Sequence, residues 1–467
     1  MDKVQKKGVG CMLDFIRRVV SADTNARYQN IPFAPVQAEI TVERLHVDGT
    51  IPPELSGLYV RNGPNPAGKI SPKQHYFSGD GMLHGVHIEK GQAKWYRNRF
   101  VRAGDVAKKR NMSDPGGPVT NGLDVSPNTN VVQFADRLYA TIEAGASMVE
   151  ITRELETVAR SDLDGSLAHG FTGHHKIDPV ENDIHAVTYA AKIGANALYQ
   201  RLTSDGRLLN RITVPLSGMT QIHDMAITQN HAIIFDLSVV FSPWALLRTT
   251  LPIAWDGKKP CRVGVIPKRG CAEDVRWFSV APCYAYHAMN AYETEGGDIV
   301  VDVSRYERAS EKDMFGPLGD TEPMIARWVL PMSGKSDVAR EEPVFDLPLD
   351  FPKISPSVEG RAYRYGYAIE ATLEPAFNRA VKLDFKTGAA QCQAFEGGMS
   401  SEMSFIPKGE AEDDGWLMGF VFQPQSNRSR LVILDARDFE AEPLASIWIP
   451  DQYVPIGTHG GWFENPR

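Results

Sequence analysis

The feature that most constrains the fold is a nearly unbroken succession of short β-type segments joined by turn residues. From about residue 36 onward, runs rich in β-branched and aromatic residues alternate with turns such as Asp80-Gly81 and Asp205-Gly206. Alternation of apolar and polar residues is visible in AVKLDF (380–385). An all-β chain of 467 residues has many sheet edges to hide, and the radial repetition of a propeller hides them. The pattern therefore predicts an all-β fold and favours a β-propeller, although no clean internal repeat sets the number of blades.

Composition excludes several classes of protein. The net charge of −8 and the lack of a basic stripe argue against nucleic acid as a partner. Five cysteines form no CxxC pair, which is typical of a reduced, cytoplasmic protein. No stretch approaches the roughly 20 apolar residues of a transmembrane helix.

We predict one large domain preceded by an extension. Residues 36–467 contain no Ser/Gly linker and no low-complexity block, so we expect them to form a single β-propeller domain. Residues 1–35 form the N-terminal extension, in which apolar positions between 12 and 20 predict a short amphipathic helix with basic neighbours. That helix would rest on a membrane surface or pack on the edge of the domain, and both interpretations stay open.

The segment FSPWALLRTTLPIAW (241–255) also departs from the regular pattern. Its tryptophans and leucines are too apolar for an ordinary surface loop. It would line an apolar entrance, dip into a bilayer or pack into the core as an insertion. Together with the N-terminal helix, it makes peripheral membrane contact one of our expectations for this cytoplasmic protein.

Four histidines stand singly in β-type stretches far apart along the chain: His174, His223, His287 and His459. Small or apolar neighbours let the backbone approach a central ion closely. Inner strands of a propeller all approach one axis, so single histidines from distant blades can meet there. A ligand set of imidazoles alone leaves open positions, which suits Fe(II) and O2. Because a lone histidine is more often a core residue, this pattern leaves both interpretations open.

A set of motifs in consistent order covers the chain from about residue 40 to its end. They include GLYVRNGPNP (57–66), HYFSGDGMLHGV (75–86), IHDMAIT (222–228), YHAMNAYE (286–293), SSEMSFIP (400–407) and THGGW (458–462). With these motifs the chain resembles the carotenoid cleavage oxygenase family, which includes enzymes that cleave carotenoids, apocarotenoids and stilbenes. The resemblance implies a seven-bladed β-propeller in which loops and short helices form a cap over an axial iron site. It also implies Fe(2+) as cofactor, with His174, His223, His287 and His459 as its ligands.

The motif around the first ligand departs from the family pattern. GHHKIDP (173–179) has His175 where the family usually has proline, and His174 aligns with the family's histidine. His175 is therefore the competitor for this position.

The resemblance also implies three acidic residues that hydrogen-bond the outer N–H groups of the ligands and fix their tautomers. By motif position the expected pairs are Glu143 with His223, Asp350 with His287 and Glu402 with His459. The family usually has glutamate where this chain has Asp350. Because aspartate is one methylene shorter, we expect its hydrogen bond to be longer or bridged by water.

The family reaction is the oxidative cleavage of a conjugated C=C bond by O2, which gives two carbonyl products. The protein supplies metal geometry, a dry cavity and placement of the alkene, so we expect no catalytic residue beyond the metal centre. Adjacency to the motifs makes five apolar side chains candidates for lining that cavity: Phe100, Ile142, Phe171, Tyr286 and Trp462.

The residue before the first acidic position bears on the substrate. Stilbene-cleaving relatives carry a lysine there, whereas this chain carries Ile142. An apolar residue favours a long apolar polyene, so a carotenoid or apocarotenoid is the predicted substrate, and cleavage of stilbenes or phenylpropenoids is the alternative. A different class also stays open, namely a propeller that binds a ligand or partner without catalysis.

Overall fold

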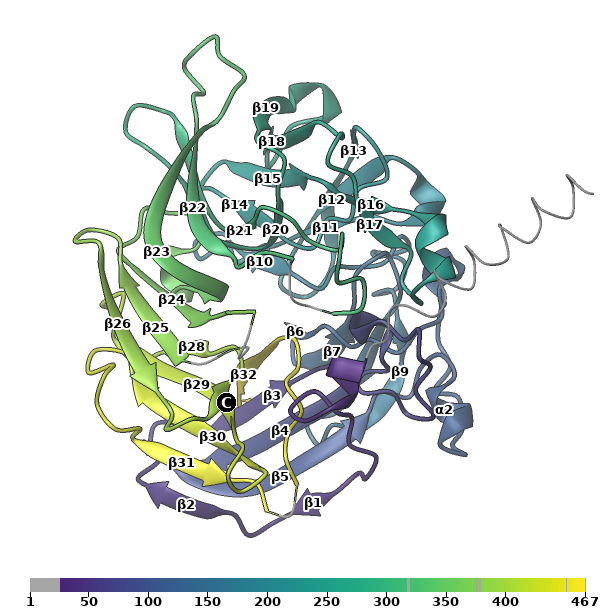
Figure 1. Cartoon of the computed structure of the whole chain (residues 1–467), viewed down its shortest axis with the longest axis vertical. Coiled ribbons are helices and arrows are strands. Elements are labelled where there is room, and N and C mark those ends of the chain that lie inside the picture. The colour runs from purple at the N-terminus through teal and green to yellow at the C-terminus, as the bar shows by residue number, and fades with distance from the viewer. Residues whose placement is uncertain (1–25, 317–319, 374–376, 378, 451, 467) are drawn as a thin grey trace, which may run out of the picture.

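The described part of the chain is almost entirely antiparallel β-structure (Figure 1). The computed structural model describes residues 26–316, 320–373, 377, 379–450 and 452–466. The predicted amphipathic helix, at residues 12–20, lies outside the described residues. The described end of the extension begins with η1 (Ala26–Gln29), and Tyr28 and Phe33 are buried against Tyr76. This end of the extension therefore packs into the β-structure.

Three sheets are four-stranded meanders that run along the chain in order. The first contains β6 (Asn130–Phe134), β7 (Arg137–Thr141), β8 (Met148–Ile151) and β9 (Thr157–Ser161). The second contains β10 (His175–Ile177), β11 (Ile184–Thr188), β12 (Asn196–Leu202) and β13 (Leu208–Pro215). The third contains β14 (Met225–Ile227), β15 (His231–Asp236), β18 (Cys261–Pro267) and β19 (Arg276–Val280).

An excursion interrupts the third meander between β15 and β18. It forms a separate hairpin of β16 (Val239–Phe241) and β17 (Ile253–Trp255), with η5 (Pro243–Leu247) between the two strands. The apolar segment 241–255 is thus a hairpin with a short helix.

One seven-stranded sheet supplies two further blades. It contains β20 (Tyr284–Glu293), β21 (Ile299–Tyr306), β22 (Met324–Leu330), β23 (Arg340–Lys353), β24 (Tyr365–Glu370), β25 (Arg379–Asp384) and β26 (Ala389–Ala394). The long strand β23 divides it, because residues 340–343 and 348 pair with β22 whereas residues 349–353 pair with β24. The first half of β23 is therefore the outer strand of one blade, and the second half opens the next.

The last two blades join the two ends of the chain. One contains β27 (Met399–Ser400), β28 (Ser404–Pro407), β29 (Gly415–Gln423), β30 (Arg428–Asp435) and β31 (Ala445–Trp448), with β2 (His46–Gly49) on its outer edge. The other contains β1 (Thr41–Val42), β5 (Gln92–Phe100), β4 (Met82–Glu89) and β3 (Gly57–Arg61), with β32 (Gly460–Glu464) on its inner edge. Because an N-terminal strand completes one blade and a C-terminal strand completes the other, the ring is closed twice. The seven-bladed propeller that the resemblance implies is confirmed.

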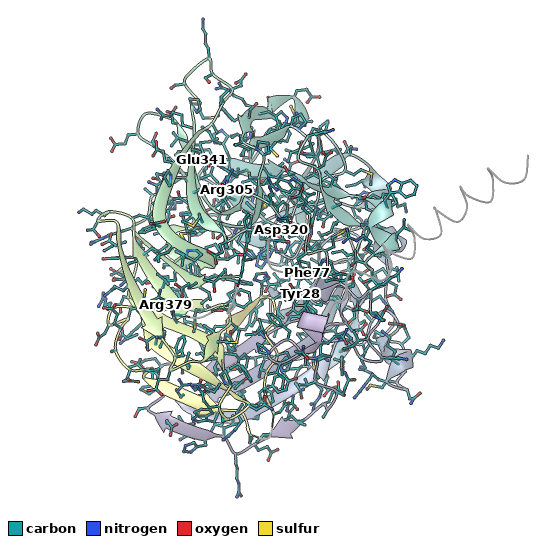
Figure 2. The ribbon with its side chains drawn as sticks, viewed as in Figure 1. Tyr28, Phe77, Arg305, Asp320, Glu341 and Arg379 are labelled. Atoms are coloured by element: carbon teal, nitrogen blue, oxygen red, sulfur yellow. The ribbon has the colours of Figure 1, made fainter. Side chains whose placement is uncertain are left out.

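The innermost strands surround a common axis, and the core lies between the blades. Strand β14 contacts β10 and β20, β20 contacts β23, and β32 contacts both β6 and β28. Buried apolar side chains of neighbouring blades interleave, as Leu58 and Leu83 do with Val131 and Leu138. Phe77 lies near the middle of the ring, whereas Arg305 and Glu341 lie farther out (Figure 2).

Short helices fill the remaining turns of the described chain. They are η2 (Tyr76–Ser78), α2 (Val106–Lys109), η3 (Thr120–Gly122), η4 (Ala191–Ile193), η6 (Ala272–Asp274) and η7 (Pro356–Val358). Of these, η2 lies against the axial site described below. No helix of the described residues has the length and apolar character needed to cross a bilayer.

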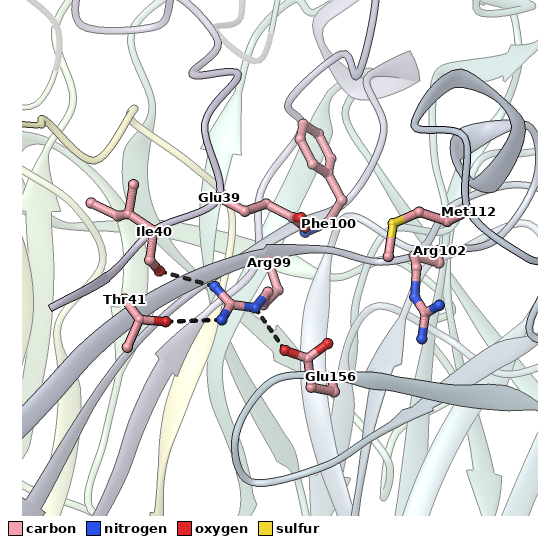
Figure 3. Close-up of a pocket in the computed structure, with 8 residues that line it drawn as sticks. All are labelled: Glu39, Ile40, Thr41, Arg99, Phe100, Arg102, Met112 and Glu156. Carbon is pink, nitrogen blue, oxygen red and sulfur yellow. Dashed lines mark hydrogen bonds and ion pairs between the residues drawn. The ribbon is translucent and has the colours of Figure 1, made fainter.

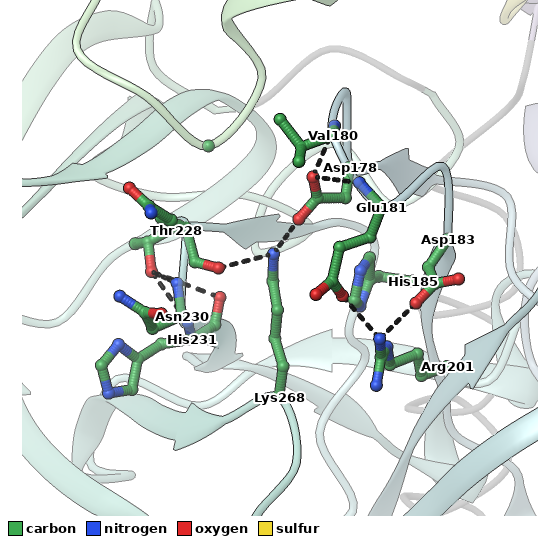
Figure 4. A network of polar contacts seen from close by, with 12 residues as sticks. Asp178, Val180, Glu181, Asp183, His185, Arg201, Thr228, Asn230, His231 and Lys268 are labelled. Carbon is green, nitrogen blue, oxygen red and sulfur yellow. Dashed lines mark hydrogen bonds and ion pairs between the residues drawn. The ribbon is translucent and has the colours of Figure 1, made fainter.

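A polar cluster joins the second and third meanders (Figure 4). The Lys268 ammonium, at the end of β18, donates to Asp178 in the β10–β11 connection at 2.6 Å. In the same region Arg201 pairs with Glu181 and Asp183. Both side chains of the Lys268–Asp178 pair are only 5% exposed, so this contact between blades is shielded from solvent.

Candidate metal centre

Four histidines from different blades converge on the axis. Each histidine stands at or in an innermost strand. His174 and His459 directly precede β10 and β32, His223 stands two residues before β14, and His287 lies within β20. The Nε2 atoms of His174 and His223 are 3.0 Å apart, and those of His287 and His459 are 3.3 Å apart. All four side chains are buried, and one ring nitrogen from each lies within 4.8 Å of the others.

Three of these rings are held from behind by carboxylates. His223 Nδ1 donates to Glu143 at 2.5 Å, His287 Nδ1 donates to Asp350 at 2.6 Å, and His459 Nδ1 donates to Glu402 at 2.9 Å. A proton on Nδ1 leaves the Nε2 lone pair free to face the common centre. The structure thus brings together the four histidines and the three acidic residues that the sequence motifs pair with them.

The expectation of a longer or water-bridged bond for Asp350 is wrong. Its contact with His287 is direct and, at 2.6 Å, lies between the 2.5 Å contact of Glu143 with His223 and the 2.9 Å contact of Glu402 with His459. The register of β23 shifts between Asp350 and Lys353, and Phe351 adopts a left-handed backbone conformation with φ of 53°. Such a bulge re-aims the side chains beside it, and here the short carboxylate reaches the imidazole.

His175 points away from the cluster, although it stands next to His174. Its ring packs 6.1 Å from that of Phe171, and it is absent from the group of converging histidines. Successive residues of an extended chain face opposite sides, so only one residue of the His-His pair can face the axis.

Burial and neighbouring charge act differently on the rings of this site. Burial alone would lower the pKa of His223, but Glu143 outweighs it and raises the pKa. Burial and the neighbouring histidines hold the pKa of His174 well below its usual range. Burial lowers the pKa of His459 to about 4, although Glu402 opposes this change. Burial alone would raise the pKa of Glu402, but Lys353 and His459 outweigh it and lower the pKa to about 2. Neutral imidazoles backed by ionised carboxylates are the state in which histidine binds a metal cation.

A small aromatic cavity lies against one side of the cluster. Its walls include the rings of Phe77 and Phe351, which lie 6.3 Å from His223 and 5.0 Å from His287. Its full lining is Tyr76, Phe77, His223, Tyr286, His287, Asp350, Phe351, Phe377, Ile456, Gly457, Thr458 and His459. The cavity volume of about 20 Å³ holds one molecule of the size of water, which is close to the size of O2.

Of the five side chains predicted to line the cavity, only Tyr286 does so. The register of β20 shifts between Ala285 and His287. This irregularity lets the adjacent residues Tyr286 and His287 face the same side, against the usual alternation of a strand.

The other four side chains lie outside the lining of this water-sized cavity, so their predicted contact with a substrate stays a prediction. Phe171 is fully buried between blades beside Phe134, and Trp462 lies opposite Tyr59 on β3. Ile142 is half-buried and does not belong to the lining. Successive residues of a strand face opposite sides. Phe171 and Trp462, three residues from a histidine of the cluster, and Ile142, next to Glu143, therefore face away from the cavity.

Phe100 belongs to a different part of the propeller. Its side chain packs with Met82 and Val106 beside a hollow that contains the Arg99–Glu156 ion pair of 2.7 Å (Figure 3). That hollow is lined by Glu39, Ile40, Thr41, Arg99, Phe100, Arg102, Met112 and Glu156.

The sequence reasoning missed most of the real lining. Tyr76 and Phe77 lie within the motif HYFSGDGMLHGV, and Phe351 directly follows Asp350, so a signal for these three existed. Phe377 and Ile456 come from segments without any motif, and only the three-dimensional fold brings them to the site.

A seven-bladed propeller in which four buried axial imidazoles could hold one metal ion fits a class of protein, the non-haem iron oxygenases with an all-histidine centre. Comparison with known proteins identifies the family. The family described as retinal pigment epithelial membrane protein matches residues 33–464, and the chain belongs to this family, that of the carotenoid cleavage oxygenases.

Relatives with known names agree with this assignment. The chain is 34% identical to a carotenoid cleavage oxygenase of Mycobacterium tuberculosis, over 95% of this chain and 98% of the relative. It is 29% identical to carotenoid 9,10(9',10')-cleavage dioxygenase 1 of Pisum sativum, over 91% and 88% of the two chains.

Solved structures show the same similarity. Lignostilbene dioxygenase of Pseudomonas brassicacearum matches with a TM-score of 0.82 and 25% identity, over 95% of this chain and 99% of that one. A variant of the Synechocystis apocarotenoid oxygenase matches with a TM-score of 0.81 and 26% identity, over 92% and 97% of the two chains. The protein is therefore an oxygenase that uses non-haem iron and O2 to cleave an alkene oxidatively, and the predicted reaction, cofactor and enzyme class are confirmed.

Proposed function

We propose that His174, His223, His287 and His459 hold Fe(2+), and that the alkene is a carotenoid or apocarotenoid. One observation carries the metal proposal. Four buried ring nitrogens lie within 4.8 Å of one another, and carboxylates occupy the far nitrogens of three of the rings. This donor set fits a divalent iron ion that keeps positions free for O2.

Each part of the protein has a distinct task in this reaction. Iron supplies the site at which O2 is activated toward an electron-rich alkene. Glu143, Asp350 and Glu402 orient the imidazoles, and no side chain need act as an acid or base. The aromatic walls formed by Phe77 and Phe351 exclude water and align the conjugated chain next to the metal.

The apolar character of the site supports a polyene as substrate. The cavity lining contains aromatic and aliphatic side chains apart from the metal-site residues and Thr458, and Ile142 stands directly before Glu143. Because the cavity holds only a water-sized molecule here, side chains of its wall must move when a polyene enters. The similarity to lignostilbene dioxygenase supports stilbenes or phenylpropenoids as the second candidate.

Iron-loaded protein incubated separately with an apocarotenal and with resveratrol tests the substrate. We expect the apocarotenal to give two carbonyl products. Turnover of resveratrol alone would overturn the polyene proposal. The variant Ile142→Lys should shift preference toward the phenol, whereas Ile142→Met, of similar size, should leave the preference unchanged.

We further propose that the protein is cytoplasmic and that it binds membrane surfaces through the 241–255 hairpin. Trp244 and Leu247 are 79% and 56% exposed, and exposed apolar side chains of this size favour contact with lipid. The hairpin is tied to the chain that leads into η2 and the cavity, since Lys73 Nζ donates to the Leu247 carbonyl at 2.7 Å and the His75 amide donates to Thr250 at 2.9 Å. An apolar substrate could thus pass from the bilayer toward the site.

Sedimentation with neutral phosphatidylcholine vesicles tests this contact. The double variant Trp244→Ser, Leu247→Ser should lose most of the binding. Val180→Ser, at an apolar residue that is 72% exposed on another loop, is the matched control and should keep it. Equal binding by both variants would exclude the hairpin as the contact.

We also propose that residues 36–467 form a single catalytic domain. The double closure of the ring by β2 and β32 supports this proposal. One cooperative unfolding transition is expected in calorimetry, and two separable transitions would contradict it.

A further inference from the structure

We propose that Tyr306 is a positioning residue that holds the short carboxylate of Asp350 against His287. This inference rests on the proposed role of His287 as an iron ligand. It concerns how the chain retains a well-oriented ligand although its acidic partner is one methylene shorter than the glutamate usual in the family.

Asp350 is held by three donors on both of its oxygens. Its Oδ1 accepts from His287 Nδ1 at 2.6 Å and from the Phe351 amide at 2.8 Å. Its Oδ2 accepts from the Tyr306 hydroxyl at 2.5 Å. Asp350 and Tyr306 are 3% and 2% exposed, so water cannot readily replace a lost donor. Without the phenol, one oxygen would be unpaired and the carboxylate could turn about its Cβ–Cγ bond.

A phenol suits this task better than a cation would. Burial and the adjacent Asp350 hold the pKa of Tyr306 well above its usual range, so the hydroxyl remains a neutral donor. A neutral donor fixes the geometry of Asp350 without cancelling the negative charge that strengthens His287 as a ligand. Among the described residues, no lysine or arginine forms an ion pair with Asp350.

The other two carboxylates are also held by a side-chain donor besides their histidine. Tyr189 donates its hydroxyl to Glu143 at 2.6 Å, so a phenol recurs at a second ligand pair. Glu402 instead pairs with the Lys353 ammonium at 3.0 Å. Each carboxylate therefore has a donor beyond its histidine, and the tightest of these contacts belongs to the shortest carboxylate.

The chain provides a matched control for Tyr306 in the neighbouring strand. Tyr284 lies directly opposite Tyr306 across β20 and β21, and it is equally buried. Both rings pack edge-on against Tyr286, at 4.8 and 5.4 Å. The Tyr284 hydroxyl, however, has no hydrogen-bond partner in the described structure. Tyr284→Phe thus removes a buried phenol oxygen beside Tyr286 without removing a donor from Asp350.

The test measures metal affinity and ligand geometry in the full-length protein. Metal-free wild type, Tyr306→Phe and Tyr284→Phe are titrated with Co(II) against a competing chelator, and the visible bands of the bound ion are recorded. A relative from Synechocystis has been solved in cobalt-substituted form. We expect Tyr306→Phe to weaken binding about 10-fold and to shift the bands, because partners behind a ligand typically contribute about 10- to 100-fold. Tyr284→Phe should stay within about 2-fold of wild type, with unchanged bands.

A second background tests whether the phenol compensates for the short side chain. In Asp350→Glu protein, the longer side chain should depend less on the phenol. The added Tyr306→Phe change should then weaken Co(II) binding by less than about 3-fold, because the effects of two coupled residues do not add. Equal losses in both backgrounds would refute compensation, and equal affinities of the two phenylalanine variants would refute positioning. If wild type bound no Co(II), or if His287→Ala bound it as tightly as wild type, the proposed metal site itself would be wrong.

Discussion

Asp350→Ala and Glu402→Ala each remove a carboxylate that hydrogen-bonds a histidine of the metal site. The structure predicts that the two changes destabilise the site unequally, and it predicts which is worse. The shorter side chain of Asp350 would by itself predict the milder loss, with Glu402→Ala the more damaging change. The contacts reverse this ranking. Asp350→Ala leaves three donors without an acceptor: the buried His287 Nδ1 and Tyr306 hydroxyl, and the half-buried Phe351 amide.

Glu402→Ala leaves fewer groups unpaired in the interior. His459 Nδ1 and the Gly460 amide lose their acceptor, but the Lys353 side chain is 31% exposed and can turn to water. Each buried donor left unpaired costs about 1–3 kcal/mol. One additional unpaired donor therefore makes Asp350→Ala the worse change, by about 1–3 kcal/mol in the free energy of unfolding of the metal-free protein.

The assay is urea unfolding of each metal-free variant, together with competition with a chelator for Fe(II) under anaerobic conditions. The second measurement separates loss of metal binding from loss of folding. Equal free energies of unfolding of the two variants, or a less stable Glu402→Ala protein, would show that counting buried donors does not describe this site.

Three further predictions address the ligands, the contact between blades and the closure of the ring. His287→Ala should lose iron and activity together, and full iron occupancy in that variant would contradict its role as a ligand. Lys268→Met should cost about 3–5 kcal/mol in urea unfolding, because it leaves the buried Asp178 carboxylate without its cation and with only the Val180 and Glu181 amides as donors. Arg269→Met, at a neighbour that is 69% exposed, should cost less than about 1 kcal/mol. Burial alone would raise the pKa of the partner Asp178, but Lys268 outweighs it and lowers the pKa from 3.8 to about 2. The stability that this pair contributes should therefore be fully present above pH 3.8 and should disappear as the pH falls through about 2. Removal of iron should speed hydrogen exchange in β32 more than in β8, whose blade carries none of the four histidines, and equal changes in the two strands would exclude local coupling of metal to closure.

Motifs located the metal-site residues, but they could not locate the cavity. The four histidines and three acids each stand in a recognisable stretch, and their pairing follows from the need to fix each imidazole. The cavity wall instead combines Phe77, Phe351, Phe377 and Ile456 from four separate segments. Adjacency to a motif pointed to Phe100, whose strand carries it to another part of the propeller. Only a β-bulge turned an adjacent residue, Tyr286, toward the site.

The number of blades was hidden in the sequence for a related reason. A repeat is detectable when every unit has similar length and boundaries. Here β23 serves two blades, the β16–β17 hairpin lengthens a third, and strands from opposite ends of the chain complete two more. Period-two alternation revealed strands, but their assignment to blades depended on pairings between distant residues.

The same distant pairings explain why the metal site is tied to the closure of the ring. His459 directly precedes β32, the C-terminal strand that pairs with β3 near the N-terminus. Its amide donates to the Thr129 carbonyl at 3.0 Å, beside β6 of the next blade. Before β32 docks, His174, His223 and His287 lie on consecutive blades of an open arc, and one ligand position remains unfilled. A metal that binds only the closed ring stabilises that ring by mass action, so iron at the proposed site would join the two ends of the chain as well as serve the reaction.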